Sequence, residues 1–119
     1  MSEASENILQ RIADRMRQDA LARPGETQKR AFKNEAVVSL CFYRESGVLE
    51  LTISRRGLSP MNDFSSGGAK RRAAWANECA VFARAFGAPK DADNANGARG
   101  EFYWNVYQWS FNQTTEAVR

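Results

Sequence analysis

The chain has 119 residues, with 17 Lys and Arg, 14 Asp and Glu, two Cys and no His. Its length, with 43% apolar and 26% charged residues, is typical of one globular domain that buries its own core. The absence of histidine removes the commonest general base, the commonest metal ligand and every Ser-His or Cys-His catalytic pair. We therefore expect a binding protein and not an enzyme, with no cofactor and no metal.

The first residues are acidic and polar and lack the cationic and apolar regions of a secretory signal. Because 18 apolar residues never run together, we expect no membrane span, no membrane partner and a cytoplasmic location. Cys41 and Cys79 lie among apolar neighbours, which favours buried free thiols over a disulfide in that compartment.

Residues 5–22 form an amphipathic pattern, because apolar side chains recur every three or four positions and charged side chains fill the other face. This pattern predicts a helix that ends at Pro24 and Gly25. Residues 26–35 have mixed charge and only Phe32 as an apolar anchor, and we interpret them as a connector.

Two strands are predicted next, at residues 36–44 and 48–55, and a Glu-Ser-Gly turn joins them as a hairpin. The second strand alternates apolar and polar residues, so one of its faces is expected to be buried and the other solvated. Residues 56–68 are rich in Gly, Ser, Pro and Asn and predict a loop long enough to be functional or mobile.

A second helix is predicted after Gly68, because its large apolar residues step by four, three and four. They are Trp75, Cys79, Phe82 and Phe86. Residues 90–100 are interpreted as a loop, and its acidic stretch lacks the Gly and Glu spacing of a calcium-binding loop. Residues 101–111 predict a long aromatic strand.

These elements predict a single α+β domain over residues 1–119 in the order α-β-β-α-β, with residues 1–4 and 112–119 frayed. Because β-α-β crossovers are right-handed, we expect the last strand to lie beside the first and parallel to the second. The expected fold is a small three-stranded mixed sheet of order 2-1-3 with two helices packed on it.

The positive charge is concentrated in one segment, since residues 69–87 hold four basic and one acidic side chain, an excess equal to that of the whole chain. Flexible backbone amides, a helix N-terminus and clustered arginines together predict a site for an anion or a partner. Its residues are Arg55, Arg56, Lys70, Arg71 and Arg72. The alternative is a solvated basic patch. Asp63 is the one carboxylate nearby in sequence, and a single carboxylate is not a catalytic constellation.

The aromatic strand offers a second candidate surface. Its aromatic interface residues are Tyr103, Tyr107, Trp109 and Phe111. Such a face can stack bases, as single-stranded nucleic-acid binders do. We favour core packing combined with an interface, because aromatic residues on strands chiefly fill cores and interfaces.

Together these features predict a small interaction protein that binds a nucleic acid, a nucleoprotein complex or an acidic protein face. A compact domain without a catalytic motif has the form of an inhibitor or adaptor, for example a phage-borne anti-defence protein of the anti-CRISPR type. The alternative is a homodimeric structural or adaptor protein that pairs through residues 101–111.

Overall fold

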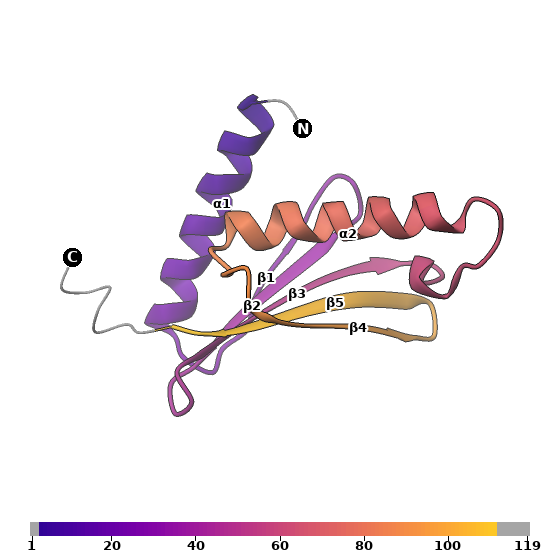
Figure 1. The fold of residues 1–119 in the computed structure, drawn as a ribbon. Helices are drawn as coiled ribbons and strands as arrows, with labels where there is room; N and C mark the ends of the chain where they lie inside the picture. Colours follow the sequence, from indigo (N-terminus) through magenta and orange to yellow (C-terminus); the bar gives the residue numbers. More distant parts are fainter. Residues whose placement is uncertain (1–2, 112–119) are drawn as a thin grey trace.

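Within residues 3–111, two α-helices cover one face of a five-stranded antiparallel sheet (Figure 1). The structure is a computed structural model that describes these residues. In chain order the elements are α1 (Glu3–Ala22), β1 (Gln28–Ala31), β2 (Val37–Tyr43), β3 (Val48–Arg56), the 3-10 helix η1 (Pro60–Asn62), α2 (Gly68–Ala85), β4 (Asp93–Arg99) and β5 (Phe102–Ser110). The predicted α+β class is confirmed, and no described helix is long and apolar enough to cross a membrane.

The sheet differs from the predicted one in strand number and order. Its order is β1-β2-β3-β5-β4, and every neighbouring pair is antiparallel. The predicted three-stranded mixed sheet of order 2-1-3 is therefore wrong. The chain leaves α2 into β4 and reverses at Gly100, so β5 enters the sheet between β3 and β4 and runs antiparallel to both. The prediction treated β5 as the strand that follows the helix in a β-α-β crossover. In the structure β4 follows the helix, and β5 returns between β4 and β3.

The two additional strands occupy segments that we interpreted as a connector and a loop. Strand β1 lies within residues 26–35, and strand β4 lies within residues 90–100. Most of their side chains are exposed, so neither strand shows the apolar alternation that marks a half-buried strand. Polar and charged residues are common on edge strands. Hydrogen bonding to β2 and β5 therefore decides the conformation of both segments.

The core lies between the helices and one face of the sheet. Leu49, Leu51 and Ile53 of β3 have no exposed surface, and the alternate residues of the strand face away from the helices. The helices contribute Leu9, Ala13, Met16, Ala20, Trp75, Cys79 and Phe82 to the same core. The two predicted helices and the hairpin are thus present. Of the ends expected to fray, residues 1–2 and 112–119 lie outside the described residues, and residues 3–4 belong to α1.

Trp75 ties α2 to the edge strand β4. Its side chain is 3% exposed, and its Nε1 donates a hydrogen bond to Oδ1 of Asn96 over 3.1 Å. Its ring also packs edge-on against Tyr103, with 4.8 Å between the ring centroids. Because a buried indole N–H without an acceptor is destabilising, this hydrogen bond helps to hold β4 beneath the helix.

The substitution Asn96→Ala tests the placement of β4. It leaves the Trp75 N–H without its acceptor, and we expect the free energy of unfolding to fall by about 1–3 kcal/mol in urea titrations. Asn77→Ala is the matched control, because Asn77 is exposed on α2 and its loss is expected to cost less than about 0.5 kcal/mol. Equal effects of the two substitutions would contradict the docking of β4 against Trp75.

Candidate functional site

An open cleft of about 800 Å³ lies at one end of the molecule. It is lined by the end of β3, the first half of α2, the β4–β5 turn and residues 57–63 of the loop that joins β3 to α2. This end lies on the right of Figure 1, where α2 begins. Segments that are far apart in the sequence therefore share one surface.

Arg55 occupies the cleft as part of an ion pair inside the fold. Both carboxylate oxygens of Glu78 lie 3.0 Å from its Nη1, and the two side chains are 26% and 22% exposed. Its Nη2 donates to the backbone carbonyl of Asn34, in the turn between β1 and β2. Arg55 thus joins β3, α2 and this turn, and its charge is already matched within the chain.

The loop at the mouth of the cleft is held by hydrogen bonds and not left free. Asp63 pairs with the guanidinium of Arg71 and accepts from the backbone N–H of Ser65 over 3.0 Å. The carbonyl of Asp63 accepts from Nη1 of Arg72. Because these contacts join the loop to the first turn of α2, the loop backbone has a defined shape.

Gly68 is required where the loop meets α2. A Cβ atom at this position would overlap the carbonyl group of Asp63, so the close approach of loop and helix depends on the missing side chain. At the neighbouring Gly67, a Cβ atom would meet only the guanidinium of Arg71, 2.9 Å away. That group ends a flexible side chain, so a small shift would disturb its contacts with Asp63 and Ser65 but not the backbone.

The hydrogen bond from the Arg71 guanidinium, followed by those from Ser65, holds the pKa of Asp63 well below its usual range. The same pair raises the pKa of Arg71. Both groups therefore stay charged at any physiological pH. The pair also explains why cations are tolerated in the first turn of α2, because the Asp63 carboxylate offsets part of their repulsion by the positive end of the helix dipole.

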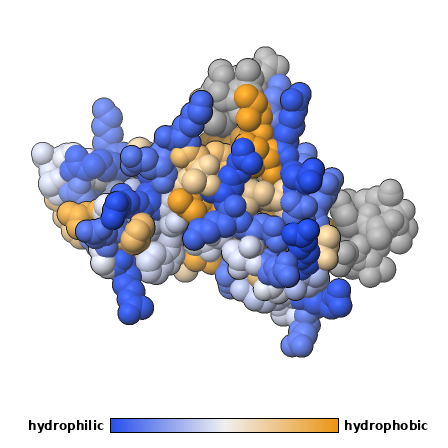
Figure 2. Space-filling view, turned by 180° about the vertical axis from the view of Figure 1, so that it is seen from behind, coloured by the Kyte–Doolittle hydropathy of each residue, from blue (hydrophilic) through white to orange (hydrophobic). Residues whose placement is uncertain are grey.

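Large apolar side chains are exposed around this hydrogen-bonded loop. Leu58 and Phe64 are 91% and 84% exposed, and Met61 in η1 and Phe102 at the start of β5 are 37% and 51% exposed. Leu58 and Phe102 line the same cleft. We call the surface formed by these four side chains the docking end. Figure 2 shows apolar surface among hydrophilic side chains at this end, on the left of the view.

Four of the five basic residues predicted to form a site make an ion pair or a hydrogen bond within the chain. Arg55 pairs with Glu78, Arg56 with Glu101 over 3.0 Å, and Arg71 with Asp63, while Arg72 donates to the Asp63 carbonyl. Strand alternation also places Arg55 and Arg56 on opposite faces of the sheet. Lys70 is exposed and forms no ion pair with a described residue.

The four predicted aromatic interface residues lie on the face of the sheet that the helices cover. Trp109 is 8% exposed and belongs to the core. Tyr103, Tyr107 and Phe111 are half-buried and pack against that core. Burial raises the pKa of Tyr103 and of Tyr107, so both phenols stay neutral at physiological pH. Strand β5 also has β3 on one side and β4 on the other, so it has no free edge for a second copy.

Sequence reasoning missed the exposed apolar residues of the loop. The Gly, Ser, Pro and Asn residues around Leu58, Met61 and Phe64 predicted a functional or mobile loop, but these three apolar residues were not singled out. Three large apolar residues in a loop that is otherwise polar were the available signal.

The carboxylates that line the cleft are paired, and the cysteines of the described residues are buried elsewhere in the fold. The two carboxylates, Asp63 and Glu78, are each held by an arginine. Burial raises the pKa of the Cys79 thiol to about 12, which leaves it protonated and unreactive. Cys41 is also a buried free thiol. No group of three or more possible metal ligands occurs within residues 3–111.

Comparisons with models of protein families, with curated proteins and with solved structures found no match to this chain. The geometry of the docking end is therefore the basis for assigning a function.

Gly68→Ala tests whether the close approach at Gly68 shapes the loop. The added methyl group overlaps the Asp63 backbone, and we expect a loss of about 1–3 kcal/mol in the free energy of unfolding. Gly67→Ala adds the same atoms one residue earlier and is expected to cost less than about 1 kcal/mol. Chemical denaturation measures both, and a larger loss for Gly67→Ala would contradict the described packing.

The pH dependence of stability tests the Asp63–Arg71 pair. Since folding lowers the pKa of Asp63, the pair stabilises the protein above the pKa of an unfolded aspartate, about 3.9, and this stabilisation is lost as the pH falls further. The Tm of Asp63→Asn is therefore expected to lie below that of the natural chain at neutral pH. The two Tm values should converge as the pH falls below about 4. A Tm difference that stays constant into strong acid would rule out the pair.

Proposed function

We propose that this protein is a non-enzymatic interaction protein, an inhibitor or adaptor, whose docking end binds an acidic surface of a partner protein. The observation that carries this proposal is the exposure of Leu58 and Phe64 on a loop with a hydrogen-bonded backbone. Large apolar side chains exposed together are unfavourable in water and mark interaction surfaces. A loop that already has its bound shape loses less conformational entropy when a partner docks.

Positive charge beside the apolar side chains supports an acidic partner. Arg72 lies over Phe64, Arg99 pairs with Phe102 in the sheet, and Lys70 is in the first turn of α2. None of the three forms an ion pair with a described carboxylate. The Arg72 guanidinium lies 5.4 Å from the centre of the Phe64 ring, so charge and apolar surface are contiguous. Apolar anchors surrounded by charges are the usual arrangement of a protein interface, in which the charges steer the partner.

A protein partner agrees better with these side chains than a nucleic acid does. Leu58 and Met61 are aliphatic and have no ring on which a base could stack, whereas a pocket in a protein would bury them. The predicted aromatic residues lie on the covered face of the sheet and are unavailable for stacking. Phe64 and Phe102 are the exposed rings of the docking end, and each already has a guanidinium near its ring centre, that of Arg72 at 5.4 Å and that of Arg56 at 5.8 Å.

The double substitution Leu58→Ser and Phe64→Ser tests the proposal. Purified protein is immobilised and exposed to a nuclease-treated lysate of its source organism, and each captured protein is then titrated against the variants in purified form. Because anchor residues each contribute about 2 kcal/mol or more, removing two of them is expected to weaken the binding of the double variant by at least about five hundredfold. Raised salt should slow association, since basic residues border the anchors.

Ile8→Ser is the matched control, because Ile8 is 57% exposed on α1, away from the docking end. It should bind the partner as the natural chain does. Equal binding by the double variant, if it is folded by circular dichroism, would exclude the docking end as the binding surface. The same capture is repeated with an untreated lysate. Capture from the untreated lysate that is lost from the nuclease-treated one would instead favour a nucleic-acid partner.

A further inference from the structure

A second surface lies between α1 and the edge strand β1. A groove of about 370 Å³ separates the two elements, and Arg11, Arg15, Lys29 and Arg30 line it. We call it the basic groove. Helix α1 and the docking end lie at opposite sides of Figure 1, so the basic groove and the docking end are separate surfaces.

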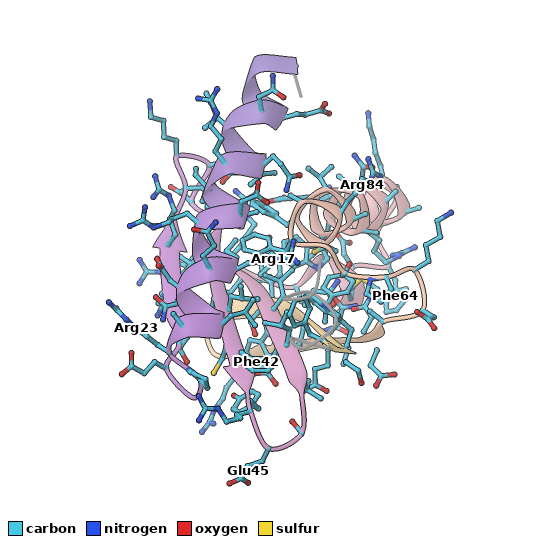
Figure 3. The ribbon with its side chains drawn as sticks, turned by 90° about the vertical axis from the view of Figure 1, so that its left-hand side faces the viewer. Arg17, Arg23, Phe42, Glu45, Phe64 and Arg84 are labelled. Carbon is cyan, nitrogen blue, oxygen red and sulfur yellow. The ribbon has the colours of Figure 1, made fainter. Side chains whose placement is uncertain are left out.

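The groove concentrates positive charge that the linear sequence hides. Residues 1–35 hold seven basic and six acidic residues, but only one carboxylate, that of Asp19, lines the groove. Its Oδ2 lies 3.5 Å from Nε of Arg15, and Arg11, Lys29 and Arg30 form no ion pair with a described residue. In Figure 3, nitrogen-tipped side chains project along the side of α1 where Arg23 lies, while Arg17 points to the interior.

The edge of β1 offers main-chain hydrogen bonds to a ligand in the groove. Strand β1 is the first strand of the sheet and pairs with β2 on its inner side. The N–H of Phe32 donates to the carbonyl of Ala36 over 2.8 Å, so the main-chain N–H of Phe32 points toward the β2 side of the strand. Because inward and outward residues alternate in an antiparallel pair, the N–H and C=O groups of Lys29 and Ala31 point to the outer edge.

The floor of the groove is apolar. Ile12 and Met16 of α1 line it between the basic side chains, and Met16 is 7% exposed. The groove thus offers unpaired cations, a free strand edge and an apolar floor. A ligand that fits all three is an extended chain with carboxylates on both of its faces and an apolar side chain between them. Its own main chain must also offer donors and acceptors.

We propose that the basic groove binds an extended acidic segment of a protein by β-strand addition to β1. Carboxylates of the segment pair with Arg11, Lys29 and Arg30, and its backbone pairs with the outward groups of Lys29 and Ala31. A nucleic-acid strand would use the positive charge but not the outward main-chain groups. The observations therefore favour an acidic peptide.

Fluorescence polarisation with a labelled Glu-Glu-Val-Glu-Glu peptide, which as a strand carries carboxylates on both faces and Val between two of them, tests the proposal. A peptide with the same side chains and every backbone nitrogen methylated has the same charge but lacks N–H donors. We expect it to bind at least about tenfold more weakly than the unmethylated peptide. Equal binding of the two peptides would overturn strand addition. Tighter binding of a labelled oligothymidylate than of the acidic peptide would overturn the peptide as the ligand.

Variants of the chain locate the peptide. Arg11→Glu with Arg30→Glu reverses charge at two of the proposed contacts in the groove and is expected to weaken binding at least about tenfold. The matched control is Arg44→Glu with Lys90→Glu, which changes the net charge equally at exposed positions outside the groove and should change binding less than about twofold. Equal loss in both double variants would overturn the groove as the site.

A third variant tests the edge of β1 without changing charge. Ala31→Pro removes an N–H that points away from β2, and proline is tolerated at such edge positions. The fold should persist by circular dichroism, while the acidic peptide binds at least about fivefold more weakly. Unchanged binding by this folded variant would contradict strand addition. The Leu58→Ser and Phe64→Ser variant should bind the peptide normally, so the two proposals can fail independently.

Discussion

The antiparallel pairing of β3 with β5 is the constraint on which the rest of the molecule depends. Nine residue pairs join the two strands, from Val48 with Ser110 to Arg56 with Phe102. This register puts the apolar side of β3 and the aromatic side of β5 under the same two helices. It also brings Arg56 beside Phe102 and Arg55 beside Tyr103 at one end of the sheet, where α2 and its preceding loop close the cleft.

The ion pairs at this end have a structural role that clustering in the sequence does not reveal. Arg55 and Arg71 look like free cations along the chain, but Glu78 and Asp63 neutralise them in the fold. Arg55 with Glu78 joins β3 to α2, and Arg71 with Asp63 fixes the loop between them. What the loop then exposes is mainly apolar surface, with the remaining cations beside it. The basic residues predicted to form the site therefore mainly hold the fold together, and exposed apolar residues make up most of the candidate surface.

The candidate site could be predicted only in part. The loop at 56–68 and the basic residues near it were identified, because glycine, serine and charge runs are local signals. The exposure of Leu58 and Phe64 was not, because exposure depends on whether another element covers a residue. The same limit applied to the aromatic strand, where both faces look alike in sequence and the helices cover one of them. The basic groove needed α1 and β1 side by side, which neither segment specifies by itself.

By itself the sequence determined the α+β class, the two helices, the β2–β3 hairpin and the aromatic strand. These elements carry their own periodicity, and their apolar faces must be buried. Only the tertiary structure decided that β1 and β4 are strands, that β5 lies beside β3, and which charges remain unpaired. Polar edge strands such as β4 gain their conformation from the hydrogen bonds of a neighbour, and ion pairs such as Arg55 with Glu78 join residues that only the folded chain brings together. Long-range contacts of this kind have no local signature, so which side chains remain exposed and unpaired is decided only by the fold.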